Sequence, residues 1–294
     1  MLPREVIRQI RRLQVRARRA VENLVGGEYH SVFRGMGISF EEVREYQPGD
    51  DIRTIDWNVT ARMGHPFIKR YIEERELTVV LVVDCSASNQ FGTERHLKRE
   101  VIAELAAVLA FSAISNNDKV ALVSFTDRVE KFVPPRKGAR HALRLIRDIL
   151  FFQPAGRGTS IREALNYVNR LLRRKAIVFL LSDFRDQGYE QAFKRTARRH
   201  DVIAVRITDP REETLPAVGL VELEDTETGS RFLLDSGSRQ VRAEFARRAV
   251  ERRANLERLS RSATADLVEM STEGDHLEAL FRFFRVREQR LRRV

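Results

Sequence analysis

Cysteine is the scarcest of the chemically informative residues in this sequence. Cys85 is the single cysteine among 294 residues, so an internal disulfide is excluded. One cysteine also gives no sign of an oxidising compartment. Histidines are few and scattered, at positions 30, 65, 96, 141, 200 and 276. None of them stands at a predicted strand end, so a histidine-centred catalytic site is not indicated.

Long apolar runs are also missing. No run approaches the roughly 18 residues that a membrane-spanning helix needs. The N-terminus has positive charge but no apolar segment of the kind found in signal peptides. A G-x-x-x-x-G-K-[ST] motif is absent as well, so we do not expect the chain to hydrolyse nucleotides itself. Together these absences predict a cytoplasmic protein.

What the chain has in excess is positive charge. The formal net charge is +11, while 43% hydrophobic and 32% charged residues are typical of a globular protein. Nucleic acid, an anionic membrane surface and acidic proteins all attract a basic chain, so charge discriminates poorly among these partners. The length allows one large α/β domain with a smaller attachment.

Residues 1–24 predict a basic amphipathic helix. Residues 1–20 contain seven arginines against one glutamate, and Val6, Ile10 and Leu13 recur at helical spacing. Such a helix can dock on the core of the protein, or it can bind a membrane surface or RNA. The sequence leaves these alternatives open.

Residues 25–77 predict a small β-rich region. Glycine and proline turns interrupt short apolar pieces, and we expect short strands at 52–59 and 67–72. Trp57 is expected in the core because it is flanked by apolar alternation. Opposite charges crowd residues 33–62, and they predict either an internal ion-pair network or a face that docks a partner. The candidate partner-binding residues are Arg44, Asp50, Asp51, Arg53, Asp56 and Arg62.

Residues 78–294 alternate apolar strands with helices. This order predicts an α/β fold with a doubly wound, mostly parallel sheet. We expect an edge strand at 130–133 that Pro134 and Pro135 stop, and an inserted β-hairpin at 216–236. The main strands are expected at 79–83, 120–125, 176–181, 202–207 and 266–270.

The strand at 79–83 is the most informative stretch of the chain. Its apolar, mostly β-branched residues are typical of a strand buried on both faces, and Asp84, Ser86 and Ser88 follow it. In open α/β sheets ligands bind at this carboxyl edge. A solvated turn is the alternative for D-x-S-x-S taken alone.

Two more oxygen-bearing side chains are expected at the same edge. Asp183 ends the strand at 176–181, and Thr159 lies in the glycine-containing loop ahead of the preceding helix. Two carboxylates and three hydroxyls are hard ligands that suit Mg²⁺ or Mn²⁺ and argue against Zn²⁺ or Cu²⁺. A carboxylate from another protein is the natural sixth ligand. The predicted metal ligands are Asp84, Ser86, Ser88, Thr159 and Asp183.

These motifs carry a resemblance. The order of D-x-S-x-S, a Gly-Thr-Ser loop and a strand-end aspartate resembles the metal-ion-dependent adhesion site of von Willebrand factor A domains. On that likeness the five residues take the five ligand roles. The stretches 33–37, 44–51, 53–62 and 218–225 resemble the signature of a bacterial family called domain of unknown function fifty-eight. That likeness runs from about residue 25 to the C-terminus.

The family resemblance implies a setting for the function. Its members resemble partners of MoxR-type AAA+ ATPases, in systems that assemble or activate other protein complexes. Many relatives begin with two transmembrane helices that this sequence lacks. We therefore expect a non-enzymatic, metal-dependent adaptor that binds the ATPase, or a client protein that supplies an acidic residue.

Two other functions are weighed against the adaptor. A Mg²⁺-dependent hydrolase would need a general base or nucleophile near the metal, and neither the scattered histidines nor Cys85 supplies one. Asp127, which follows the strand at 120–125, could reach the site, but a role in a turn is favoured. Binding of nucleic acid or an anionic surface would rest on the arginine-rich helices, without any recognisable nucleic-acid module. The sequence favours the adaptor.

Overall fold

The computed structural model describes residues 4–24, 39–72, 76–93 and 96–292. The chain divides into two compact units, one of residues 33–77 and one of residues 1–32 together with 78–294.

The small unit is built on a two-stranded antiparallel sheet. Strand β1 (Ser39–Glu45) pairs with β2 (Phe67–Ile72), and the second strand is the one that the sequence predicted. Between them lie a 3-10 turn, η1 (Ile52–Thr54), and a short helix, α3 (Trp57–Met63). The prediction of strands at 52–59 was therefore wrong.

The helix α3 forms because its two ends are satisfied. The side chain of Asp56 accepts hydrogen bonds from the backbone N–H groups of Asn58 and Val59, and Gly64 ends the helix with a φ of 79°. A helix turns successive residues by about 100°, so the apolar alternation that suggested a strand is not kept on one face. Trp57 is 68% exposed, which makes its predicted core position wrong.

The large unit contains a six-stranded sheet in the order β10-β7-β6-β3-β4-β5. Five strands are parallel, and β5 runs antiparallel to β4 at the edge, which confirms the predicted fold class. The strands are β3 (Thr78–Asp84), β4 (Lys119–Phe125), β5 (Val129–Arg136), β6 (Ile177–Ser182), β7 (Asp201–Thr208) and β10 (Asp266–Ser271).

Strand β5 is longer than the sequence predicted. It continues through Pro134 and Pro135, and Arg136 pairs with Val120 across a register shift. An edge strand has one side free of sheet partners, and a bulge removes further ladder bonds, so prolines are tolerated there. The expectation that the two prolines stop the strand was wrong.

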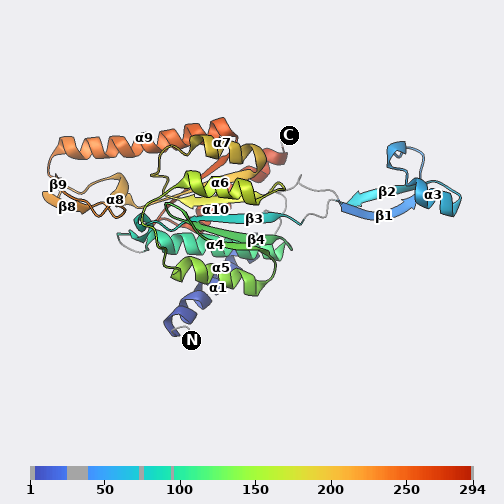
Figure 1. Cartoon of the computed structure of the whole chain (residues 1–294), viewed down its shortest axis with the longest axis horizontal. Helices are drawn as coiled ribbons and strands as arrows, with labels where there is room; N and C mark the ends of the chain where they lie inside the picture. The colour runs from blue at the N-terminus through green and yellow to red at the C-terminus, as the bar shows by residue number, and fades with distance from the viewer. Residues whose placement is uncertain (1–3, 25–38, 73–75, 94–95, 293–294) are drawn as a thin grey trace. The chain divides into compact units, whose positions relative to one another are not determined.

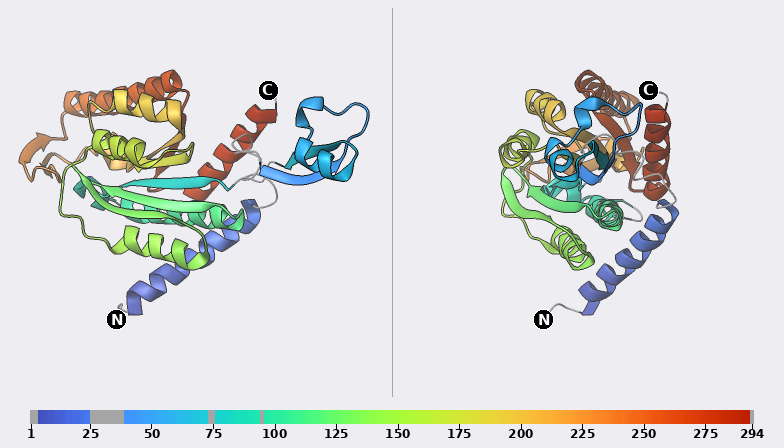
Figure 2. Two further views of the ribbon diagram at one scale, coloured as in Figure 1. Left: turned by 45° about the vertical axis from the view of Figure 1, so that its right-hand side comes forward. Right: turned by 90° about the vertical axis from the view of Figure 1, so that its right-hand side faces the viewer.

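Helices cover both faces of this sheet (Figures 1 and 2). Helices α1, α4 and α5 lie on one side of the sheet, and α10 packs on β10 and α4. Helices α6, α7 and α9 lie on the other side. Their bounds are α1 (Arg4–Leu24), α4 (Lys98–Ser115), α5 (Ala139–Phe151), α6 (Ile161–Leu171), α7 (Glu190–Arg199), α9 (Arg239–Ala263) and α10 (His276–Arg292).

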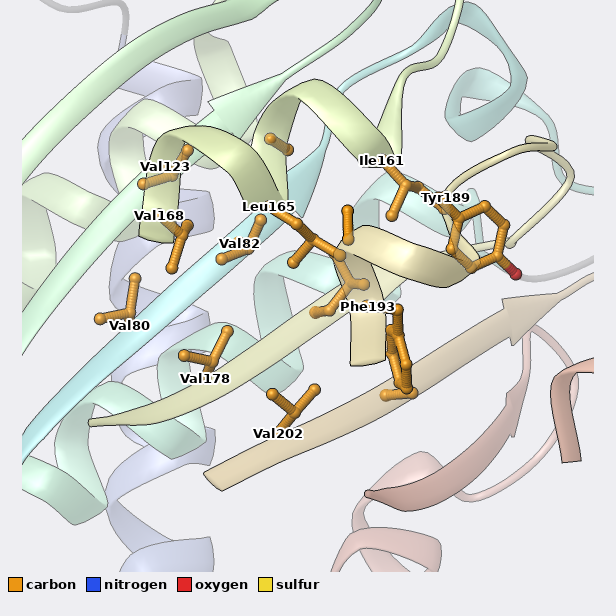
Figure 3. Packing of buried hydrophobic residues seen from close by; sticks show 14 of the residues in the cluster. Val80, Val82, Val123, Ile161, Leu165, Val168, Val178, Tyr189, Phe193 and Val202 are labelled. Atoms are coloured by element: carbon orange, nitrogen blue, oxygen red, sulfur yellow. The ribbon is translucent and has the colours of Figure 1, made fainter. Parts of the chain in front are cut away.

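The core fixes strand β3 from both sides. Val80 and Val82 pack in the cluster that includes Leu165 of α6 and Phe193 of α7 (Figure 3), and all four are fully buried. The alternate residues, such as Leu81, are equally buried on the opposite face. Each such aliphatic side chain contributes about 1.5–3 kcal/mol when it leaves water. The end of β3 is therefore held in a defined position.

The N-terminal helix α1 is docked on the core. Ala17, Ala20 and Val21 are buried, and the helix packs against α4. Arg16 also reaches Glu104 of α4, with 3.6 Å between their charged atoms. Of the alternatives left open by the sequence, docking on the core is what the structure shows. In the part of the chain that the structure describes, no helix is long and apolar enough to cross a membrane.

The inserted hairpin is present as predicted. A short helix, α8 (Pro210–Glu213), leads to strands β8 (Leu220–Glu224) and β9 (Arg231–Asp235), which pair antiparallel. Figure 1 shows the hairpin beyond the end of the sheet at which β3 stops. This position brings the hairpin next to the candidate site.

Candidate functional site at the carboxyl edge of the sheet

Strands β3 and β6 are neighbours at the point where the order of strands reverses. The chain passes from β3 to β4 on one side, and from β6 to β7 on the other. Ligands bind at such a switch point in open α/β sheets. Asp84 and Asp183 stand at the ends of these two strands and are only 1% and 4% exposed.

Asp84 is held by hydrogen bonds to its own loop and to the neighbouring strand. One carboxylate oxygen accepts from the backbone N–H of Ser86 at 2.9 Å, and the other accepts from the hydroxyl of Ser182 at 2.6 Å. Burial, and then repulsion from Asp183, raise the pKa of Asp84 to about 7. No cation among the described residues pairs with it. Charge on Asp84 is therefore poorly compensated.

The two serines complete this loop. The hydroxyls of Ser86 and Ser88 lie 3.0 Å apart, and the 3-10 turn η2 (Ala87–Gln90) carries the second of them. The Asn89 side-chain amide donates to the backbone oxygen of Asp84 and to the hydroxyl of Ser86, at 3.2 and 3.3 Å. The loop is thus a rigid arrangement of buried oxygens.

Asp183 differs from Asp84 because it has a cation. The ammonium group of Lys98 donates to Asp183 and to Glu212, each at 2.8 Å, and Lys98 is fully buried. Although burial opposes its ionisation, the charge and hydrogen bond of Lys98 hold the pKa of Asp183 below its usual range. Lys98 was not among the residues predicted from the sequence. Its spacing to Ile102 and Leu105 on α4 was the available signal, because it places the lysine on a buried face.

Close backbone contacts bring the Thr159 loop to the same edge. The N–H of Ala87 donates to the oxygen of Arg157 at 3.0 Å, and the N–H of Ser160 donates to the oxygen of Thr126 at 2.8 Å. Gly156 permits this approach, since a Cβ atom there would lie 2.0 Å from a carboxylate oxygen of Asp127. The glycine-containing loop is thereby joined to the Ser86–Ser88 loop.

Thr159 also contacts the inserted hairpin. Its hydroxyl donates to the carboxylate of Glu227 at 2.6 Å. Burial, and to a smaller extent the charge of Asp183, raise the pKa of Glu227 despite this hydrogen bond. Nothing in the sequence pointed to Glu227, because a glutamate in a polar turn is typical of a solvated residue.

A cavity of about 580 Å³ is lined by Ser88, Thr159 and Glu227, whereas Asp84, Ser86 and Asp183 are not part of its lining. Ser88, Thr159 and Glu212 contribute its polar wall on the side of the sheet. Its apolar lining consists of Phe91, Leu215, Leu223, Phe232 and Phe245. The structure thus brings Asp84, Ser86, Ser88 and Asp183 into one hydrogen-bonded and charge-coupled cluster, with Thr159 on the cavity wall beside Ser88.

The donor set fits a hard divalent cation. It offers two carboxylates and three hydroxyls, and magnesium and manganese prefer such oxygen ligands. The described residues include no group of three or more His, Cys, Asp or Glu side chains that could hold a metal, so a histidine- or thiolate-rich centre is not found there. Metal binding by the five oxygens stays a prediction.

The charges around the site are close to balance. Arg185 lies 3.6 Å from Glu212, which itself pairs with Lys98. When all are ionised, three carboxylates (Asp84, Asp183 and Glu212) face two cations (Lys98 and Arg185). These five groups sum to one negative charge, and Arg252, Arg211, Asp186 and Glu227 are further charged groups beside them. A bound divalent ion would add two positive charges to this cluster.

The predicted partner-binding charges of the small unit have contacts within that unit. Arg44 pairs with Asp50 at 2.7 Å, and Asp50 also accepts from the N–H of Gln47. Asp51 accepts from the N–H of Arg53 in η1, and Asp56 caps α3.

The side chain of Arg53 is 93% exposed, and Arg62 is exposed as well. An ion-pair and capping network accounts for the aspartates, whereas a docking role of the exposed arginines stays a prediction.

Candidate nucleophiles and bases have contacts elsewhere. Burial, and then the charge of Asp84, raise the pKa of Cys85 to about 12, so its reactive thiolate form is scarce at neutral pH. Among the described histidines, His141 contacts the backbone oxygen of Val120 and His276 contacts Glu104. No described histidine is among the residues that line the cavity beside Ser88 and Thr159.

Comparison with known proteins agrees with the signature in the sequence. A family model described as "Protein of unknown function DUF58" matches residues 42–255. A Mycobacterium tuberculosis protein described as uncharacterized protein Rv1480 is 33% identical over 279 residues, which cover 93% of this chain and 87% of that protein.

Two solved structures resemble the chain more distantly. The conserved hypothetical protein BatB from Bacteroides thetaiotaomicron is 18% identical, with 72% of this chain and 99% of that chain covered and a TM-score of 0.49. The SpRpn10 VWA domain is 12% identical, with coverages of 70% and 94% and a TM-score of 0.40. The sequence matches are much the stronger of the two kinds of similarity. Because these sequence matches cover most of the chain, it belongs to the family of proteins of unknown function DUF58.

Proposed function

We propose that this protein is a non-enzymatic adaptor that binds another protein through a divalent cation at the carboxyl edge of its sheet. Mg²⁺ or Mn²⁺ would be held by Asp84, Ser86, Ser88, Thr159 and Asp183. The partner would contribute an aspartate or glutamate carboxylate to the cation. Following the family resemblance, the setting is a MoxR-type AAA+ ATPase system, in which either the ATPase or its client supplies that carboxylate.

One observation carries this proposal. Two buried carboxylates end adjacent strands beside a set of hydroxyls, and only one of the two pairs with a cation among the described residues. A carboxylate buried without a counter-charge costs free energy, so such a group is retained where it performs a task. Binding a cation is the task that its oxygen-rich surroundings support.

The bound cation would supply positive charge that a partner carboxylate can neutralise. The chain's own residues do the rest of the work. The Asn89 amide orients the backbone of Asp84 and the hydroxyl of Ser86, and the apolar lining of the cavity offers Phe91 and Phe232 to an incoming segment. Lys98 keeps Asp183 ionised. Its ammonium group also occupies one carboxylate oxygen of Asp183.

Hydrolysis is the less well supported alternative. It requires a group that removes a proton from water beside the metal. No described histidine lines the cavity, and Cys85 holds its proton at neutral pH. Binding to an anionic surface is also less well supported, because α1 packs its apolar face on the core and Arg16 is paired with Glu104.

The experiment that tests the adaptor measures binding of a purified MoxR-type ATPase from the same organism. Binding is compared in Mg²⁺ and in excess chelator, without nucleotide, for the parent, Asp84→Asn and Glu163→Gln. Glu163 is an exposed residue in the first turn of α6, and its substitution removes the same negative charge as Asp84→Asn. It therefore serves as the matched control for net charge.

We expect binding in Mg²⁺ for the parent and the control, and loss of binding in chelator and in Asp84→Asn. If the basic surface attracted an acidic partner by charge alone, both substitutions would maintain or strengthen binding. Retained binding by a folded Asp84→Asn protein in chelator would contradict the proposal.

A further inference from the structure

The turn of the β8–β9 hairpin has one side chain that faces inward. The residues from Glu224 to Ser230 are exposed, apart from Glu227, which is half-buried. Its carboxylate accepts the 2.6 Å hydrogen bond from Thr159, one of the five predicted metal ligands. The second carboxylate oxygen lies 3.7 Å from the position that a Cβ atom on Gly158 would take. The hairpin therefore places a carboxylate directly against the site.

This position is fixed by the turn. Asp225 accepts hydrogen bonds from the N–H groups of Glu227 and Thr228, at 2.9 and 3.3 Å, and Gly229 adopts a φ of 72°. Backbone bonds close the turn from both sides, from Asp225 to Ser230 and from Gly229 to Asp225. The backbone that carries Glu227 is thus an ordered, hydrogen-bonded turn and not an open loop.

The two faces of the hairpin support the same orientation. Leu223 and Phe232 are directly paired, so they share one face, and both line the cavity over the site. The opposite face is mixed, with Glu222 and the pair of Glu224 with Arg231 beside the exposed Leu220 and Leu233. The face of Leu223 and Phe232 is therefore the side from which the hairpin contacts the site.

The charge count gives Glu227 a role there. A divalent ion would add two positive charges to the site, and a carboxylate at coordination distance would offset one of them. Glu227 hydrogen-bonds to Thr159, a predicted ligand of that ion. The described residues hold no preformed group of three carboxylates, so Glu227 would move toward the ion on binding.

From this geometry we propose that Glu227 is an additional, internal ligand of the cation. The hairpin then closes the site, and a partner binds by exchanging its own carboxylate for that of Glu227. This inference rests on the proposed metal site, and it adds that the unpartnered protein is self-blocked. A carboxylate partner must therefore compete with a ligand attached to the same chain.

The test compares Mn²⁺ binding by the parent, Glu227→Gln and Glu222→Gln. Glu222 lies on the same hairpin with a 58% exposed side chain, so its substitution removes the same charge away from the cavity. Mn²⁺ affinity is measured by calorimetric titration. Water-proton relaxation then reports how many water molecules exchange on the bound ion.

Loss of one carboxylate ligand should weaken Mn²⁺ binding by at least about tenfold in Glu227→Gln, because affinity follows the number of charged ligands. Water relaxation per bound ion should rise, since water takes the vacated position. Added acetate should reverse that rise in Glu227→Gln and have little effect in the parent. Glu222→Gln should match the parent in all three measurements.

The outcomes separate this inference from the function on which it rests. Equal Mn²⁺ affinity and equal relaxation in the three proteins would overturn the role of Glu227 and leave the metal site intact. A parent protein that binds no Mn²⁺ would overturn both. Amide hydrogen exchange of β6 and β3 in Glu227→Gln checks that the core is unchanged, so that weaker binding is assigned to the lost carboxylate.

Discussion

Asp84 and Asp183 end neighbouring parallel strands and are almost equally buried, yet their surroundings push their pKa values in opposite directions. Asp183 shares a buried ammonium group with Glu212. Asp84 receives only neutral donors, the backbone of Ser86 and the hydroxyl of Ser182. Burial raises the pKa of both aspartates, and only at Asp183 is this effect outweighed, by the charge and hydrogen bond of Lys98.

This asymmetry teaches how the site is prepared for a ligand. Helix α4, which begins after the Asp84 loop, supplies Lys98 to the carboxylate of the other strand. One half of the site is thus neutralised by the fold itself. The other half lacks a charge partner within the described residues, and it is there that a cation from solution would stabilise the protein most.

The largest effect on stability is expected from a substitution of Lys98, the cation that distinguishes Asp183 from Asp84. Lys98→Met leaves Asp183 and Glu212 without their shared cation, and removing one partner of a buried pair typically costs about 3–5 kcal/mol. Urea denaturation should show that loss in the free energy of unfolding. Lys194→Met, at an exposed site on α7, should change it by less than about 0.5 kcal/mol. Equal midpoints for the two variants would show that the buried lysine is not essential to the pairing.

His200 extends the comparison to a buried titratable group away from the site. It is 3% exposed, neither ring nitrogen has a hydrogen-bond partner, and burial, with a smaller contribution from Arg199, lowers its pKa from 6.5 to about 4. The unfolded chain takes up the proton first as the pH falls. His200 should therefore cost about 2–3 kcal/mol of stability between pH 6.5 and pH 4, with no such cost above that range.

Stability measured from pH 7 to pH 4 in the parent and in His200→Leu checks this. The variant should lose less stability than the parent over that range. Identical pH profiles would show that the imidazole is solvated or paired in solution.

A smaller effect is expected at the two aspartates, where the two substitutions should change the free energy of unfolding in opposite directions. In metal-free protein Asp84→Asn should raise the free energy of unfolding by about 1–2 kcal/mol, because it removes a buried charge and its repulsion of Asp183. Asp183→Asn should lower it, because Lys98 then loses one of two carboxylates. Thermal unfolding in chelator measures both, and a change of the same sign in the two variants would refute the proposed asymmetry.

Much of the large unit could be predicted because its strands are buried on both faces. An apolar run such as 79–83, bounded by polar residues, has few structures open to it in a chain of alternating helices and strands. The small unit offered less information. The apolar alternation around Ile55 and Trp57 fits a strand as well as a short helix, and the cap at Asp56 decided the outcome.

Half of the candidate site could be predicted and half could not. Asp84 and Asp183 each follow an apolar run that the sequence identifies as a strand. Because parallel strands end at the same edge of a sheet, the topology alone places both aspartates there. Lys98 and Glu227 reach the same edge from a helix and from a hairpin turn. Their contacts depend on three-dimensional packing, and a lysine or glutamate in such segments is usually solvated. Burial of the helix face was the one signal that could have identified Lys98.

Titration of Mn²⁺ into the parent, Asp84→Asn and Glu163→Gln tests the central claim most directly. Asp84→Asn preserves the size of the side chain and an oxygen that accepts from Ser86, and Glu163→Gln controls for the lost negative charge. The account predicts one Mn²⁺ site per chain in the parent and in the control, and a site lost or at least about tenfold weaker in Asp84→Asn. Equal Mn²⁺ affinity in all three proteins would contradict it.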